Sequence, residues 1–218
     1  MTFQTMVGML AQGFLTTLAI FFLTLVGSLL LGLLVSFGRM SHFTIVRTII
    51  KVYISIMRGT PLMLQLMVVY FGPSLLLGIT PPGNWRFAAV IVAFIINYAA
   101  YFGEIYRSGI EAIPAGQREA AQVLGYTRVQ TFIKIILPQM IKRVLPPVTN
   151  EVITLVKDTP LASVIGTVEM FTRAKQIAVA PNSPGMMTFV VAAVFYYVFN
   201  YLVAFVMERI EKALDYYD

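Results

Sequence analysis

The sequence predicts an all-α fold, a polytopic helical membrane protein with five transmembrane helices. Of its 218 residues, 58% are hydrophobic and only 12% are charged, which lies outside the usual range for soluble domains. The apolar residues form long stretches separated by polar segments, and two of those segments are rich in Lys and Arg. With neither an internal repeat nor a soluble segment, the pattern predicts one transmembrane domain over residues 1–218.

The first span is predicted over residues 13–38, an uncharged stretch long enough to cross a bilayer with some tilt. Ser28 and Gly32 form a pair of small residues four positions apart, a spacing that lets another helix approach closely. Residues 1–12 are uncharged and moderately amphipathic. We expect them to lie along the membrane interface as a short separate helix.

The other four spans are apolar stretches bounded by turn residues or charges, at about 61–79, 87–103, 138–157 and 185–207. The helix of the second span is expected to begin before it, near Val46. In the fourth span, Pro146 and Pro147 break backbone hydrogen bonds, which membrane proteins tolerate mainly beside a cavity or packed protein. Residues 158–185 are rich in proline and glycine and are expected to form a loop.

The positive charges predict the orientation. Residues 39–60 and 104–137 each carry four Lys or Arg, whereas 80–86 carry one and 158–185 carry two. Cytoplasmic loops are enriched in these residues, so the amino terminus is predicted outside and the carboxyl terminus in the cytoplasm. Anchoring at the inner membrane face also accounts for the net charge of +6, and no nucleic-acid partner is expected.

Residues 118–138, within the cytoplasmic loop 104–137, predict a helix, a sharp elbow and a second helix. Glu119 to Leu124 is a run of good helix formers. Gly125 suits the left-handed residue that ends a helix, and Thr127 with Gln130 forms a capping box that starts the next. An ordinary amphipathic loop is the alternative interpretation. The charges that keep this stretch out of lipid are Arg118, Glu119, Arg128 and Lys134.

Polar side chains at membrane depth are costly, which makes them candidate substrate contacts. Glu151 lies about 10 Å into a helix that enters lipid at Val144, at ~1.5 Å per residue. The alternative for Glu151 is an internal salt bridge with Lys157, Lys142 or Arg143. The polar residues of the fourth span fall on two adjacent stripes, one of Glu151, Thr154 and Asp158, the other of Asn150, Thr154 and Lys157.

The third span adds Asn97 and Tyr98 as candidate substrate contacts, since both lie deep in the predicted span. An intramembrane Asn often serves only as a hydrogen bond between helices, and this alternative stays open. Glu104, near the cytoplasmic end, fits a structural ion pair with Arg107 or Arg58 better than a substrate contact.

The sequence lacks the residues that covalent catalysis, nucleotide binding and metal binding require. The sequence has no cysteine, no GxxxxGK[ST] phosphate-binding loop, and a single histidine, His42, in a basic interfacial segment. No His, Asp and Glu cluster has metal-ligand spacing. The chain is therefore predicted not to be an enzyme, with no catalytic residue, no metal site and no cofactor of its own.

The elbow is similar to a known family motif. Glu119-Ala120-Ala121, Gly125, Ile135 and Leu137-Pro138 resemble the EAA loop of binding-protein-dependent ABC importer permeases. Three further stretches resemble the polar amino acid branch of that family, although Ser108 and Pro160 replace residues common in it. These stretches are Met57–Leu62, Tyr101–Ile110 and Lys157–Ser163.

The resemblance implies a permease subunit in a bacterial-type cell membrane. Its partners would be a second permease subunit, identical or related, an extracellular substrate-binding protein, and two cytoplasmic ATPase subunits that bind ATP and Mg. Membrane lipid surrounds it, and an amino acid is the substrate. The residues implied to couple to the ATPase are Glu119, Ala120, Ala121 and Gly125 of the motif, with neighbouring Arg118 and Leu124.

Together these features predict an ATP-driven importer of polar amino acids that works by alternating access. Two carboxylates on one membrane helix, Glu151 and Asp158, favour a basic amino acid. A self-contained secondary carrier or channel is the alternative, with Glu151 and Glu104 as ion or proton sites. That alternative leaves the elbow unexplained and lacks the repeat symmetry of many carriers.

Overall fold

The computed structural model describes residues 1–214, and the regular elements in this part of the chain are all helices, without a strand. Four long helices form the body: α1 (Phe3–Arg39), α4 (Trp85–Glu111), α7 (Leu137–Asp158) and α9 (Met186–Ala213). Shorter elements connect them: α2 (Thr44–Gly59), α3 (Leu62–Leu77), α5 (Ala115–Val123), α6 (Arg128–Thr131), the π-helical turn η1 (Phe132–Ile136), the 3₁₀ helix η2 (Thr159–Ile165) and α8 (Met170–Ala178).

The amino-terminal segment is part of α1 and does not form a separate helix. The expectation that residues 1–12 lie along the interface is therefore wrong. Met6 and Leu10 are fully buried against α8 and the start of α9, and this packing continues the helix to its first turn. The Thr2 side chain caps that turn by accepting a hydrogen bond from the Thr5 amide.

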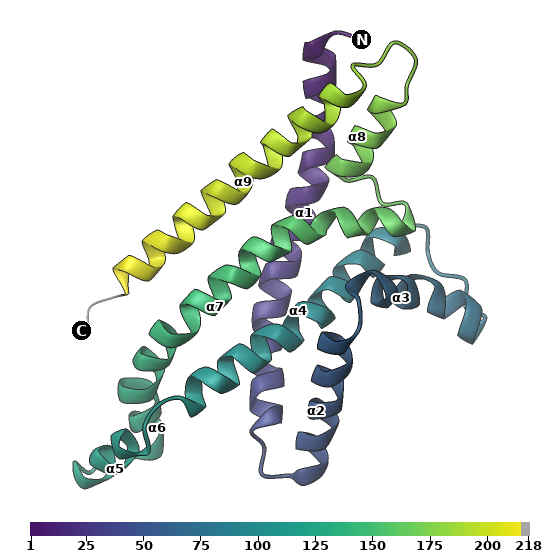
Figure 1. Cartoon of the computed structure of the whole chain (residues 1–218). Helices are drawn as coiled ribbons and strands as arrows, with labels where there is room; N and C mark the ends of the chain where they lie inside the picture. Colours follow the sequence, from purple (N-terminus) through teal and green to yellow (C-terminus); the bar gives the residue numbers. More distant parts are fainter. Residues whose placement is uncertain (215–218) are drawn as a thin grey trace.

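The second apolar segment is a broken helix. α2 begins at Thr44, close to the expected start, and α3 continues after a bend of 111° between them. The break falls at Thr60 and Pro61, where proline ends the preceding helix because it has no N–H to donate. Figure 1 shows α2 beside one half of α1, with α3 turned away at a steep angle.

By length and composition, α1, α4 and α9 are sufficient to cross a membrane, and the bent pair α2–α3 adds a fourth crossing if it is taken as one span. α7 has nearly the predicted bounds of the fourth span, but its charged residues keep it outside this set. The presence of several apolar crossing helices is confirmed, whereas the number five stays a prediction.

Two connecting segments are more ordered than expected. Residues 158–185 were expected to form a loop but contain η2 and α8. The loop predicted over 104–137 is shorter, because α4 runs on to Glu111 and η1 leads directly into α7. Within α7, Pro146 and Pro147 remove backbone donors without ending the helix.

α1 and α4 pack closely along their length because small residues let their backbones approach, as the Ser28–Gly32 pair predicted. A β-carbon added at Gly32 would lie 2.8 Å from Cβ of Phe102, and one added at Gly103 would lie 2.5 Å from Cγ1 of Val35. The buried core then extends from this contact to α7 through Tyr98 and other apolar side chains.

We expect Gly32→Leu to destabilise the protein, because a larger side chain there must push α1 away from Phe102. Overpacking of this kind costs about 1–3 kcal/mol, so the apparent Tm in detergent should fall by at least about 2 °C. Gly8→Leu, on the same helix with no atom within 4 Å of the added β-carbon, is the matched control. Equal Tm values for the two variants would contradict this packing.

Candidate functional site

The first part of the candidate site joins α4 to the end of α7. The Tyr98 hydroxyl donates a 2.7 Å hydrogen bond to Oδ2 of Asp158. Tyr98 is only 2% exposed, and its ring lies 6.2 Å from that of Tyr101. Two residues predicted from separate spans, Tyr98 and Asp158, are thus brought into direct contact.

Glu151 lies on the same face of α7, half-buried, two turns before Asp158. The charged groups that act on it electrostatically are Arg58, from the last turn of α2, and Asp158. The Arg58 guanidinium sits over the Tyr101 ring, 5.3 Å from its centroid, in a cation–π contact. Within residues 1–214, the two ion pairs both belong to Arg107, so Glu151 forms no salt bridge with Lys157 or Arg143 there.

The other predicted members of the α7 stripes differ in their surroundings. The Thr154 hydroxyl donates to the Asn150 carbonyl at 2.9 Å, a bond within the helix. Asn150 and Lys157 are exposed, and Lys157 acts electrostatically on Asp158. Glu151, Thr154 and Asp158 therefore form a half-buried face, with Asn150 and Lys157 at its edges.

Asn97 is held in an amide pair with Gln65 of α3. Its Nδ2 donates to Oε1 of Gln65 at 2.9 Å and to the Met57 carbonyl at 3.2 Å. Gln65 Nε2 in turn donates to the carbonyls of Met57 and Thr60, at 3.0 and 3.1 Å. Met57 is four residues before Pro61, so in a continuous helix its carbonyl would need the N–H that proline lacks. The two amides replace that donor.

Gln65 was not singled out from the sequence. The sequence does contain a pattern that indicates such a residue. Pro61 lies inside a predicted helix and leaves a backbone carbonyl without its donor, and a side-chain amide, that of Gln65, follows four residues later. Glu104, by contrast, is paired as expected: Arg107 forms salt bridges with both Glu104 and Glu111 on the same helix.

The elbow has the geometry that its residues predicted. Gly125 has φ +77°, and the amides of Gly125 and Tyr126 donate to the carbonyls of Gln122 and Ala121, both at 3.0 Å. This is a Schellman motif, in which a left-handed residue closes the end of α5. The capping box at Thr127 and Gln130 then starts α6, with both of its hydrogen bonds present.

The tip of the elbow exposes apolar side chains outside the bundle. Val123 is 88% exposed, Leu124 73% and Val129 67%. Of the residues implied to couple to an ATPase, Ala121 is buried and the others are exposed: Arg118, Glu119, Ala120, Leu124 and Gly125. Figure 1 shows α5 and α6 projecting at the end of the molecule that also holds the α1–α2 turn, opposite the amino terminus. An exposed apolar tip on a polar segment is typical of a docking surface.

Glu169, in a segment expected to be a loop, was also missed. It is fully buried and caps α8 by accepting hydrogen bonds from the amides of Phe171 and Thr172 at 2.6 and 2.7 Å. Tyr196 of α9 donates to it at 3.1 Å, and Thr17 of α1 accepts from the next amide, that of Met170. Its position three residues before Thr172 resembles an ordinary helix cap, and nothing in the sequence marks its burial.

Apolar crossing helices, polar groups at depth and a projecting apolar tip define the class as a multi-pass membrane transport component. Residues 28–216 match the family described as binding-protein-dependent transport system inner membrane component. The chain belongs to this family, as the EAA-like motif indicated.

Similar proteins agree with this family. The arginine transport system permease protein ArtQ of Bacillus subtilis (strain 168) is 37% identical over 203 residues, which is 93% of this chain and 91% of that protein. The L-cystine transport system permease protein TcyB of the same organism is 34% identical over 209 residues, covering 95% and 87%. A crystal structure of an amino acid ABC transporter with histidines has a TM-score of 0.85 at 32% identity, covering 98% of this chain and 99% of that one.

We expect Gln65→Leu and Asn97→Leu each to lower the apparent Tm, at about 1–3 kcal/mol. Gln65→Leu removes the amide that donates to the Thr60 carbonyl, and Asn97→Leu leaves Oε1 of Gln65 without its donor. The double variant should depart from the sum of the two losses by about 0.5 kcal/mol or more, because only there does the Met57 carbonyl lose both of its side-chain donors. Gln139→Leu is the control, since among the described residues the Gln139 amide bonds only to the Ile135 carbonyl of the preceding turn. An Asn97→Leu protein with unchanged Tm and a raised KM for uptake would instead favour substrate contact.

Proposed function

We propose that this chain is the permease subunit of an ATP-driven importer that moves polar amino acids, preferably basic ones, into the cytoplasm. The observation that carries the substrate class is the half-buried acidic face of α7, where Glu151 and Asp158 lie without a salt bridge to another described residue. A cationic partner stabilises a carboxylate at depth, and the side chain of a basic amino acid supplies one. The relative that transports arginine supports the same choice.

The residues of the polar cluster have separate roles in this proposal. Glu151 and Asp158 attract the cationic side chain of the substrate, and Tyr98 orients Asp158 through its hydroxyl. Asn150, Thr154 and Lys157 border the path. Arg58, held over Tyr101, acts electrostatically on Glu151 and can balance the carboxylate when no substrate is bound.

The elbow in this proposal transmits the work of ATP hydrolysis. Two cytoplasmic ATPase subunits bind ATP and Mg, and each receives one elbow of a permease pair made of two identical or two related chains. The exposed tip at Val123 and Leu124 supports docking, and the continuous helical path from α6 through η1 into α7 supports transmission to Glu151. Alternating access follows if the two states offer the substrate different contacts.

The proposed orientation places the amino terminus outside and the carboxyl terminus in the cytoplasm, with five spans in a bacterial-type cell membrane. The two segments that carry four positive charges each, 39–60 and 104–137, support it, because both turn at the same end of the molecule (Figure 1). An external substrate-binding protein would then deliver the amino acid at the opposite end.

We expect Glu151→Gln to reduce ATP-dependent uptake of labelled arginine in proteoliposomes by about tenfold in kcat/KM, the loss of roughly 1.4 kcal/mol of charge pairing. Uptake of glutamine, which has no cationic side chain, should change much less. Glu208→Gln removes an exposed carboxylate on α9 and serves as the control. Arginine uptake that is unchanged in Glu151→Gln would remove this residue from the site.

We expect Gly125→Asp to leave the permease folded but to detach the ATPase. A β-carbon added at Gly125 has no atom of the chain within 4 Å, so the new side chain causes no clash. It does strain the backbone, because Gly125 has a positive φ, and it adds a charge at the apolar tip. Co-purification of the ATPase should fall at least about tenfold, which is the loss of ~1.4 kcal/mol of binding. His42→Asp, an exposed substitution in the α1–α2 turn at the same end, is the control. An intact complex that still imports would show that the elbow is not the docking site.

A further inference from the structure

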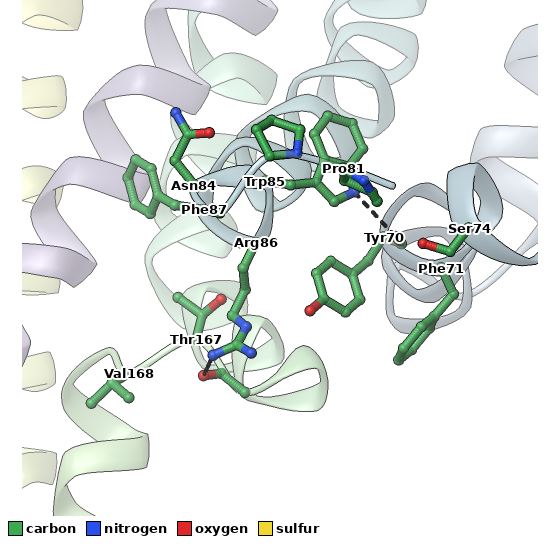
Figure 2. Close-up of a pocket in the computed structure, with 13 residues that line it drawn as sticks. Tyr70, Phe71, Ser74, Pro81, Asn84, Trp85, Arg86, Phe87, Thr167 and Val168 are labelled. Atoms are coloured by element: carbon green, nitrogen blue, oxygen red, sulfur yellow. Dashed lines mark hydrogen bonds between the residues drawn. The ribbon is translucent and has the colours of Figure 1, made fainter. Parts of the chain in front are cut away.

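A cavity of 680 Å³ opens at the end of α4 opposite the elbow. Its walls are the last turns of α3, the α3–α4 turn and the segment 166–168 that follows η2. Figure 2 shows Tyr70, Phe71 and Ser74 on one side, with Arg86 reaching across toward Thr167. Tyr98 lies twelve residues further along α4, about 18 Å at ~1.5 Å per residue, so this cavity is separate from the Tyr98–Asp158 cluster.

The cavity wall contains two hydrogen-bond donors that the described residues satisfy weakly or not at all. Arg86 is the one charged residue among the described lining residues, and it is exposed. Within residues 1–214 its one hydrogen bond is long, 3.5 Å from Nη1 to the Gly166 carbonyl. Thr167 is only 6% exposed, yet its hydroxyl has no hydrogen-bond partner within residues 1–214. A guanidinium beside a free hydroxyl suits a carboxylate, which can accept from both.

The remaining lining suits a protein partner. Tyr70, Trp85 and Arg86 are of the residue types that dominate binding hot spots, and Trp85 is fixed by a 3.1 Å bond from Nε1 to the Tyr70 carbonyl. A cavity of 680 Å³ that is open to solvent can admit a protein loop as well as a small molecule. An inserted loop with an acidic side chain at its centre matches both its size and its charge.

We propose that this cavity, with Arg86 and Thr167 at its base, receives an Asp or Glu side chain on a surface loop of the external substrate-binding protein. The inference rests on the proposed function, because it requires that orientation and that partner. The carboxylate binds the Arg86 guanidinium, and the aromatic rings of Tyr70, Phe71 and Trp85 enclose the loop around it. Docking at this point places the partner over the outer end of α4, from which α4 leads to Tyr98.

The test uses the complete permease–ATPase complex in lipid nanodiscs and the substrate-loaded binding protein that stimulates its ATPase activity. Arg86→Glu should raise the half-maximal concentration of binding protein by at least about tenfold, while the basal ATPase activity stays unchanged. Arg86→Ala and Thr167→Val should give smaller increases. Added salt should weaken stimulation of the wild-type complex more than that of Arg86→Ala. Lys175→Glu, an exposed charge reversal on α8, is the matched control and should stay within about twofold.

The possible outcomes distinguish a failure of this inference from a failure of the proposed function. If no binding protein stimulates the wild-type complex, the proposed function fails. If stimulation occurs but Arg86→Glu and Lys175→Glu respond alike, the docking site lies elsewhere and this inference is wrong. Calorimetric binding of free arginine or glutamate that depends on Arg86, without the binding protein, would instead identify a vestibule for the amino acid. An Arg86 effect seen only with phosphatidylglycerol nanodiscs, and not with phosphatidylcholine, would identify a lipid site and also overturn the proposal.

Discussion

The lack of water in a bilayer is the constraint on which this structure depends, because every backbone polar group at depth needs a partner within the protein. Pro61 withholds the donor that the Met57 carbonyl requires, and the chain bends by 111° there. Gln65 and Asn97 supply the missing hydrogen bonds from α3 and α4. The broken segment is therefore fastened to α4, and the last turn of α2 is held where Arg58 faces Tyr101 and influences Glu151.

Much of the fold could be predicted because membrane depth imposes simple sequence rules. Long uncharged stretches predicted α1 and α9. Gly125 and the capping box of Thr127 and Gln130 predicted the position of the elbow to within a residue. The errors fall where tertiary packing overrides local composition. Residues 1–12 look interfacial until Met6 and Leu10 are seen packed against α8 and α9, and α8 itself lies in a stretch whose proline and glycine content suggested a loop.

The candidate site could be predicted in its residue types but not in its pairings. Helical spacing placed Glu151 and Asp158 on one face of α7. Tyr98, predicted to lie deep in the third span, contacts Asp158. Spacing along one helix carries no information about which residue of another helix lies opposite. The partners of Asn97 and the position of Arg58 over Tyr101 depend on the α2–α3 break, whose angle no local pattern specifies.

The cap at Glu169 has a mechanical consequence. A carboxylate buried without a cation depends on fixed dipoles and hydroxyls for its solvation, so the groups around it cannot separate without exposing the charge to an apolar environment. α8, the amino-terminal half of α1 and the beginning of α9 are therefore held together around this one carboxylate. A movement of α7 relative to these helices would be taken up in η2 and residues 166–169, which join α7 to α8.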